Sequence, residues 1–406
     1  MQIYVSITIL IIFLLVAVLT APLAKRIGFP FSALLVIEGF LGSELIVALG
    51  FDLGLRWYHF HDLVFFILLP VLIFESALNI DVKLLLKNLI PIIILAIPIM
   101  LLSTVVTAVL LYYGIGHPLG FPIVAALLTG AILSATDPVA VLDVFKQIKA
   151  PARLSTLVDG ESLFNDATVI VLFGLFISFA QMDAGSFSGL EALKEFIFVF
   201  FGGILVGAVS GVLFMFLYRV SRGSFAKSLI SIISAYSAFI LAEHFLHVSG
   251  VMAVLVTGLT ISWERCKGAE ESKFVEKLWE FNAYTANILI FLLVGITITP
   301  EMFTSHWLAM LIGIASVLIA RAIGIFVVLP LVSKLPYVEP ISRGYQAIIF
   351  WGGLRGAVVV ALALSIPLEL EYWYTVQSIA YGVVLFTLFV QAPTIKVLMK
   401  WVGVRE

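Results

Sequence analysis

Residues 121–180 read FPIVAALLTGAILSATDPVAVLDVFKQIKAPARLSTLVDGESLFNDATVIVLFGLFISFA. The stretch contains two apolar runs, 121–145 and 153–180, and its basic residues gather only where the two runs meet. Each run exceeds the roughly 20 residues that a helix needs to cross a hydrocarbon core about 30 Å thick. Each run also holds acidic side chains well inside it. The stretch therefore predicts two membrane-spanning helices that carry carboxyl groups into the bilayer.

The composition of the whole chain agrees with a membrane protein. Of the 406 residues, 62% are hydrophobic and 12% are charged, whereas a soluble domain is typically about 25% charged. A net charge of −2 and the absence of a basic block argue against a nucleic-acid partner. The first apolar run, 2–22, is longer than the apolar core of a signal peptide and has no positive segment before it, so we interpret it as a membrane helix.

Thirteen apolar runs have lengths suited to crossing a bilayer. They are 2–22, 31–50, 60–79, 89–113, 121–145, 153–180, 193–218, 228–245, 248–263, 279–298, 306–331, 342–367 and 375–399. With these boundaries, 19 of the 23 Lys and Arg residues fall on one side of the membrane, two on the other side and two inside helices. Positive residues are enriched in cytoplasmic loops. We therefore expect a multi-pass protein of the plasma membrane, with its N-terminus outside and its C-terminus in the cytoplasm.

The odd count suggests an internal symmetry. Two six-helix units, helices 1–6 and 8–13, would be inverted relative to each other and joined by helix 7, as in many transporters. Helices 5 and 12 then occupy equivalent positions. The predicted fold is an all-α integral membrane protein of 13 transmembrane helices, with two inverted six-helix repeats and with helices 5 and 12 broken.

Ionisable side chains inside these helices mark the candidate site, because each costs several kcal/mol to hold in a bilayer. The clearest are Glu38, Glu75, Asp137, Glu161, Asp166, Arg321 and Arg355. Acids outnumber bases in this set. The excess negative charge requires a cation or a proton to compensate it.

Helix 5 contains Ser134-Ala-Thr-Asp-Pro138. The ring of Pro138 disfavours helical geometry at the residue before it, so a break near Thr136 and Asp137 would free carbonyl oxygens beside a carboxylate. Hard oxygen ligands of this kind suit Na⁺, K⁺ or Li⁺. The alternative is a simple proline kink, with Asp137 as an N-cap of the second half-helix.

Helix 6 contains Gly160-Glu-Ser-Leu-Phe-Asn-Asp-Ala167. Ser162 and Asp166 are four residues apart on one helix face, and Glu161 and Asn165 form a second pair beside them. Four polar groups within two turns cannot face lipid. They line either an ion site or a structural polar seam between helices.

Two arginines complete the pattern. Arg321 lies in the middle of helix 11 and needs a partner, for which Glu161 is preferred over snorkelling; Asp137 and Asp166 then remain for the ion. Arg355 lies among three glycines in Trp351-Gly-Gly-Leu-Arg-Gly-Ala357. These glycines predict an unwound turn in helix 12, or else close helix packing.

At these residues the chain resembles the cation:proton antiporter family, which includes bacterial and eukaryotic sodium/proton exchangers. GESLFNDA at 160–167 carries the likeness most specifically, and SATDP at 134–138 and WGGLRGA at 351–357 follow in the matching helices. The resemblance implies a homodimer that needs no cofactor. It implies an ion site with these residues: Asp137, Asp166, Ser162, Thr136, Asn165 and, through water, Glu75. It also implies a structural ion pair between Glu161 and Arg321. Arg355 is expected to have a structural or pH-related role. It lies at a helix break that includes Gly353, and the other break is at Pro138.

The resemblance also implies how residues 1–406 are organised as one transporter unit. The expected parts are dimerisation helices 1–3 and the start of the core within 1–113, core helices 4–6 within 89–180, linker helix 7 with dimerisation helices 8–10 within 193–298, and core helices 11–13 within 306–399. Because the sequence ends at Glu406, soon after the last predicted helix, regulation by a long cytoplasmic tail is not expected.

The predicted function is secondary active exchange of Na⁺, or of Li⁺ or K⁺, for H⁺ by alternating access. A protonated Asp166 excludes the cation, and a deprotonated one binds it. Because Asn165 is neutral where a second aspartate would add a proton carrier, one-for-one electroneutral exchange is expected. The rival hypotheses are a cation channel and an intramembrane aspartyl protease, and we do not expect an enzyme.

Overall fold

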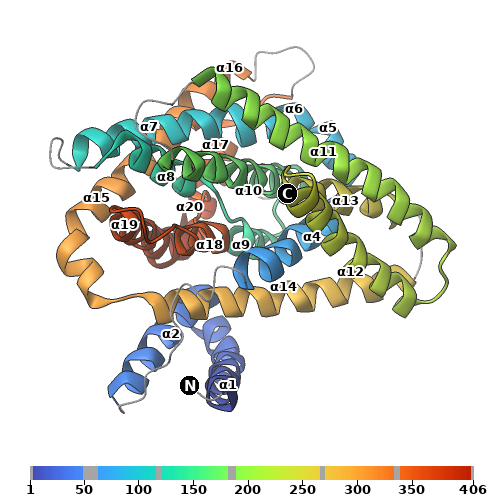
Figure 1. Ribbon diagram of the computed structural model, residues 1–406, viewed down its shortest axis with the longest axis horizontal. Coiled ribbons are helices and arrows are strands. Elements are labelled where there is room, and N and C mark those ends of the chain that lie inside the picture. Colours follow the sequence, from blue (N-terminus) through green and yellow to red (C-terminus); the bar gives the residue numbers. More distant parts are fainter. Residues whose placement is uncertain are drawn as a thin grey trace.

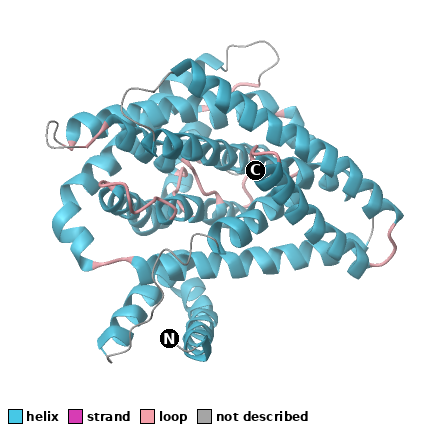
Figure 2. Ribbon diagram, viewed as in Figure 1, coloured by secondary structure: helices cyan, strands magenta, loops and turns pink. Residues whose placement is uncertain are grey.

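The computed structural model describes residues 3–48, 63–115, 121–181, 189–265, 270–332 and 339–403. Over these ranges all regular elements are helices, as Figure 2 shows. The all-α fold predicted from the sequence is thereby confirmed for the described part of the chain.

The helices follow one another in the order labelled in Figure 1. Their bounds are α1 Ile3–Ile27, α2 Phe31–Ala48, η2 Leu63–Leu68, α4 Leu69–Asn79, α5 Val82–Lys87, α6 Leu89–Ile94, η3 Leu95–Ile99, α7 Met100–Gly114, α8 Ile123–Ser134, α9 Val139–Ile148, α10 Ala152–Gln181, α11 Gly189–Val220, α12 Ser224–Ile240, η4 Leu241–Phe245, α13 Gly250–Arg265, α14 Glu270–Thr297, α15 Pro300–Ile323, η5 Gly324–Val328, α16 Leu329–Val332, α17 Arg343–Trp351, α18 Ala357–Leu364, α19 Trp373–Phe386, η6 Thr387–Gln391 and α20 Ala392–Val402. The segments labelled η are π-helical and continue the α-helices beside them without a gap in sequence.

Eight of the described helices are long and apolar enough to cross a membrane by length and composition. Shorter apolar helices at Leu63–Asn79, Ile123–Ser134 and Gly250–Trp263 fall on three further predicted spans. Several boundaries differ from expectation, most of all at the starts of α14 and α15, which begin at Glu270 and Pro300, earlier than the predicted 279 and 306. The apolar pattern locates the part of a helix that is suited to the membrane, and it misses helical turns with polar residues at the ends. The total of thirteen spans stays a prediction.

Two predicted helices are interrupted in the middle. The first stops at Ser134, continues in extended geometry at Ala135, and resumes at Val139. The second stops at Trp351 and resumes at Ala357. The two interruptions cross, and the N–H of Asp137 donates to the carbonyl oxygen of Leu354 at 2.8 Å in an isolated antiparallel bridge. Each break thus satisfies part of the other's backbone inside the bundle.

Helix packing places this crossing near the centre of the molecule. The long α14 packs against α2, α4 and α12, and α11 packs against α13; α7 packs against α8 and α15, and α15 against α19. Figure 1 shows α14 along one side with α1 and α2 projecting from it, and α10 running through the middle of the view. The contact between α2 and α14 depends on Gly39 and Gly295, because a Cβ on either glycine would collide with the other helix's backbone.

Candidate functional site

Asp137 joins the two broken helices through both of its carboxylate oxygens. Oδ1 accepts a hydrogen bond from the N–H of Val139 at 3.0 Å, and Oδ2 accepts one from the N–H of Ala357 at 3.3 Å. Val139 begins α9 and Ala357 begins α18. The carboxylate therefore lies at the N-termini of two half-helices, where unsatisfied N–H groups favour negative charge.

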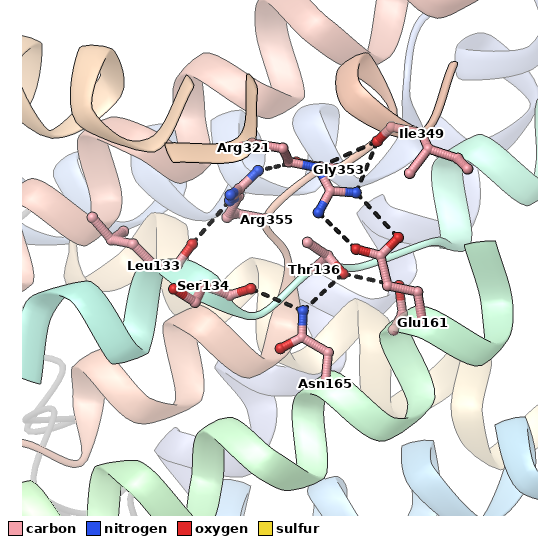
Figure 3. A network of polar contacts seen from close by, with 10 residues as sticks. Leu133, Ser134, Thr136, Glu161, Asn165, Arg321, Ile349, Gly353 and Arg355 are labelled. Carbon is pink, nitrogen blue, oxygen red and sulfur yellow. Dashed lines mark hydrogen bonds and ion pairs between the residues drawn. The ribbon is translucent and has the colours of Figure 1, made fainter. Parts of the chain in front are cut away.

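Arg355 lies at the same crossing and donates hydrogen bonds to carbonyl oxygens (Figure 3), whereas Asp137 accepts them from N–H groups. Its Nε donates to the carbonyl of Leu133 at 3.0 Å, and its Nη1 donates to the carbonyl of Gly353. These carbonyls belong to the C-terminal turn of α8 and to the turn that follows α17. The buried guanidinium thus compensates the negative ends of two half-helices.

Arg321 and Glu161 form a buried ion pair beside the crossing. Nη1 and Nη2 of Arg321 donate to Oε1 and Oε2 of Glu161 at 2.7 and 3.2 Å. Nε and Nη2 also donate to the carbonyl of Ile349 at 3.2 and 2.8 Å. Gly353 packs on this guanidinium, and a Cβ there would collide with it. The fork-shaped pair satisfies the charge of Glu161 inside the protein and turns that carboxylate away from solvent.

The polar side chains of α10 hold the first break in place. Asn165 Nδ2 donates to the carbonyl of Ser134 at 2.9 Å and to Oγ1 of Thr136 at 3.3 Å. The hydroxyls of Thr136 and Ser162 lie 3.1 Å apart. Figure 3 shows Asn165 of α10 facing Ser134 and Thr136 of the break. Within the described residues Oδ1 of Asn165 has no hydrogen-bond partner.

A cavity of about 60 Å³ lies beside the crossing. Its polar lining consists of Glu75, Ser76, Asp137, Asp159, Ser162, Asp166 and Asn287, and the rest of its lining is apolar. Oδ1 of Asp166 is shielded from solvent and accepts no hydrogen bond within the described residues. Asp166 and Asp137 are close enough to interact as like charges. No Lys or Arg among the described residues lines the cavity, so the arrangement can bind a small cation or protons.

The predicted site residues divide into three groups in space. Asp137, Asp166, Ser162, Glu75 and Pro138 line the cavity. Thr136 and Asn165 lie behind it and hold its wall through the contacts above. Glu161, Arg321, Gly353 and Arg355 belong to the network on the other side of the crossing.

Sequence reasoning left three polar groups out of the site. Asp159, Ser76 and Asn287 line the cavity but were not predicted to do so. Asp159 lies seven residues before Asp166, which is two turns along one helix face. That spacing could have identified it. Ser76 and Asn287 carry no such signal, because they come from α4 and α14 and meet α10 only through packing.

A second, wider crevice of about 690 Å³ lies beyond the other side of Asp166. Its polar lining includes Glu195, Glu243 and Glu369, and α10 contributes Ile170 to it. Ile170 is one helical turn from Asp166. A single turn of α10 therefore separates the two openings along this helix.

The cavity differs from a resident metal centre. In the described part of the chain, no three His, Cys, Asp or Glu side chains come together in a way that could hold a bound metal ion. The cavity offers hard oxygen ligands, namely the carboxylates of Asp137 and Asp166 and neutral oxygens such as that of Ser162. These ligands do not form a rigid coordination shell. Such a set suits an ion that enters and leaves.

Comparisons with known proteins point to one family. A family model described as "Sodium/hydrogen exchanger, transmembrane" matches residues 11–401. The chain is 34% identical to the Na⁺/H⁺ antiporter ApNhaP of Aphanothece halophytica over 377 residues, which cover 92% of this chain and 70% of that protein. It is 33% identical to the low-affinity Na⁺/H⁺ antiporter NhaS1 of Synechocystis over 389 residues, which cover 94% of this chain and 71% of that protein.

The fold has a counterpart among solved structures. It is similar to the sodium proton antiporter MjNhaP1 of Methanocaldococcus jannaschii at pH 8, with a TM-score of 0.81 and 19% sequence identity, covering 97% of this chain and 100% of that one. The family model spans nearly the whole chain, and the two relatives match it over most of their own length. The chain therefore belongs to the sodium/hydrogen exchanger family, a family of membrane transporters and not of enzymes.

Proposed function

We propose that the chain is a secondary antiporter that exchanges Na⁺ for H⁺ at Asp137 and Asp166. The observation that carries the proposal is the unequal distribution of charge at the crossing. Both buried guanidinium groups are directed to carbonyls or to Glu161, while the cavity beside them is lined by four carboxylates and by no Lys or Arg among the described residues. The two relatives described above are named Na⁺/H⁺ antiporters, which supports Na⁺ as the cation in preference to Li⁺ or K⁺.

Exchange follows from competition for one pocket. A carboxylate pair that interacts as like charges is stabilised either by a proton or by a cation between them. When Asp166 is protonated, the pocket loses the negative charge that binds Na⁺. When it is deprotonated, Asp137, Asp166 and the hydroxyl of Ser162 can coordinate the ion. Asn165 adds no proton carrier, so we expect one proton for one Na⁺ and an electroneutral cycle.

Alternating access requires the site to meet the two sides of the membrane in turn. The small cavity and the wider crevice approach Asp166 from opposite directions along α10. A movement of the core helices (89–181 and 300–402) against a scaffold (3–79 and 189–297) would open one and close the other. The scaffold would form a homodimer, in keeping with the resemblance. The excess of Lys and Arg on one side supports a cytoplasmic C-terminus in the plasma membrane.

The test is proton flux in proteoliposomes that contain the purified protein and a pH-sensitive dye. Addition of Na⁺ should move protons in the opposite direction, and an imposed membrane voltage should leave the rate of an electroneutral exchanger nearly unchanged. Na⁺ flux without proton movement would instead support a channel. Absence of any cation-driven flux from well-folded protein would refute exchange, and cleavage of membrane peptides would then support a protease.

A further inference from the structure

The cavity contains a second pair of acids: Glu75 is predicted to contact the ion through water, and Asp159 has no role in the exchange mechanism described above. Asp159 and Glu75 both line it, and they are close enough to interact as like charges. Glu75 Oε1 accepts a hydrogen bond from Asn79 Nδ2 at 2.6 Å, which fixes that carboxylate on α4. The cavity thus holds two pairs of mutually repelling carboxylates, although a one-for-one exchanger needs only one pair.

The two pairs lie at different depths. Asp159 precedes Asp166 by seven residues on α10, which places it about 10 Å nearer the N-terminal end of that helix. This end carries Arg153, and Lys146 at the end of α9 interacts electrostatically with Asp159. It is the Lys- and Arg-rich side, the predicted cytoplasmic face. An ion that moves from this face to Asp166 along α10 passes Asp159 first.

We propose that Asp159 and Glu75 form an entry station, a second binding position at which a monovalent cation is held in transit between the Lys- and Arg-rich side and the Asp137–Asp166 pocket. The station is continuous with that pocket through the same cavity. Oδ1 of Asp166, buried and without a hydrogen-bond partner in the described residues, is the oxygen to which the ion passes. The inference rests on the proposed Na⁺/H⁺ exchange. It adds Asp159 as a binding residue between the Asp137–Asp166 pocket and the Lys- and Arg-rich side.

The entry station spans two groups of helices. Asp159 is on α10, which packs against α8 in the proposed core, whereas Glu75 is on α4, which packs against α13 and α14 in the proposed scaffold. A cation between the two carboxylates cancels their repulsion and holds α10 and α4 together while the site faces this side. When the core moves, the pair separates and the station is lost. The station therefore acts on one face of the membrane only.

One-sided action gives a direct test. Membrane vesicles that are everted or right-side-out present opposite faces to added Na⁺, and the dependence of proton flux on Na⁺ concentration gives KM and kcat at each face. Asp159→Asn should raise KM for Na⁺ about tenfold at the Lys- and Arg-rich face, as expected for removal of one charge in a partly buried site. At the other face KM should change less than twofold, and kcat should change little at either face. Asp159→Glu, which keeps the charge, should restore KM.

The matched control is Glu280→Gln, which removes an acid exposed on α14 outside the cavity and should leave both KM values unchanged. Equal KM for Asp159→Asn and the wild type at both faces would overturn the entry station, as would an equal rise at both faces. If Asp159→Asn does not fold, as judged by size-exclusion chromatography in detergent, Asp159→Ser, which also removes the charge, tests the same asymmetry. A wild-type protein without Na⁺-driven proton flux would refute the proposed function itself, a result distinct from either outcome above.

Discussion

Glu161 and Asp166 lie five residues apart on the same helix and have opposite surroundings. Glu161 is held by both arms of Arg321 at 2.7 and 3.2 Å, while Asp166 faces the cavity with one oxygen unpartnered in the described residues. An α-helix turns about 100° per residue, so neighbouring polar residues can serve different sides of it. The comparison separates the charge that holds the structure together from the charge that is left for an ion.

The largest expected effect is on Asp166, because its Oδ1 faces the cavity without a hydrogen-bond partner in the described part of the chain. Asp166→Asn should lower Na⁺-driven proton flux at least 100-fold while thermal stability in detergent stays equal to that of the wild type or rises, since one buried repulsion is removed. Flux in proteoliposomes and a melting curve measure the two quantities. Residual cation-dependent flux above a tenth of the wild-type rate would contradict the assignment.

Glu161→Gln should lower stability, in contrast to Asp166→Asn. The substitution leaves the buried guanidinium of Arg321 without its counter-charge, and breaking a buried pair in this way costs about 3–5 kcal/mol. The apparent melting temperature and the yield of monodisperse protein should fall well below those of Asp166→Asn. Equal stability of the two variants would remove the distinction between the structural and the ion-facing acid.

Gly356 tests the geometry of Asp137. A Cβ at this position would collide with Oδ2 of Asp137, so Gly356→Ala should displace the carboxylate. We expect KM for Na⁺ to rise about 10- to 100-fold, as for a small misplacement of a binding group. Gly189→Ala on α11 is the control, because a Cβ there meets no atom within 4 Å and the residue lines neither the cavity nor the wider crevice. An unchanged KM in Gly356→Ala would separate Asp137 from ion binding.

The smallest effect concerns charges outside the membrane. Glu339 pairs with Lys87 at 3.2 Å and with Arg153 at 3.3 Å, and the hydrogen bond from Lys87 followed by the charge of Arg153 holds the pKa of Glu339 below its ordinary 4.5. Its stabilising contribution is therefore present above pH 4.5 and is lost as the pH falls through the lowered pKa. Glu339→Gln should lower the melting temperature slightly at pH 7, and the difference from the wild type should shrink as the pH is lowered below 4.5. A difference in melting temperature that stays constant while the pH is lowered from 7 to well below 4.5 would contradict an electrostatic cause.

The sequence predicted much of this arrangement because its strongest signals are local. Pro138 and the glycines around Arg355 mark the two breaks, and apolar run lengths mark the helices. The prolines and glycines act on the backbone next to them, so their effect can be inferred without knowing the fold. The alternative of a simple proline kink with Asp137 as N-cap agrees with the structure only in part: Oδ1 of Asp137 accepts a hydrogen bond from the N–H of Val139, the first residue of α9, but the N-cap residue is Pro138.

The remaining features depend on which helices meet. The bond from Asp137 to the start of α18 joins residues 220 positions apart, and no periodicity predicts it. The partners of Arg355, the carbonyls of Leu133 and Gly353, are main-chain atoms that every residue carries. Asp159 is the exception, because its spacing of seven residues from Asp166 is a local signal that places both side chains on one face of α10.

The bridge between Asp137 and Leu354 uses only the main chain of Leu354. Position 354 can therefore change its side chain, within the limits of a buried apolar site, without loss of the bridge. Insertion or deletion of a single residue in either interruption is different, since it would shift Asp137 away from Ala357 and Arg355 away from Leu133 at once. The two short segments should accordingly tolerate substitution at 354 while their lengths, four residues at 135–138 and five at 352–356, remain fixed.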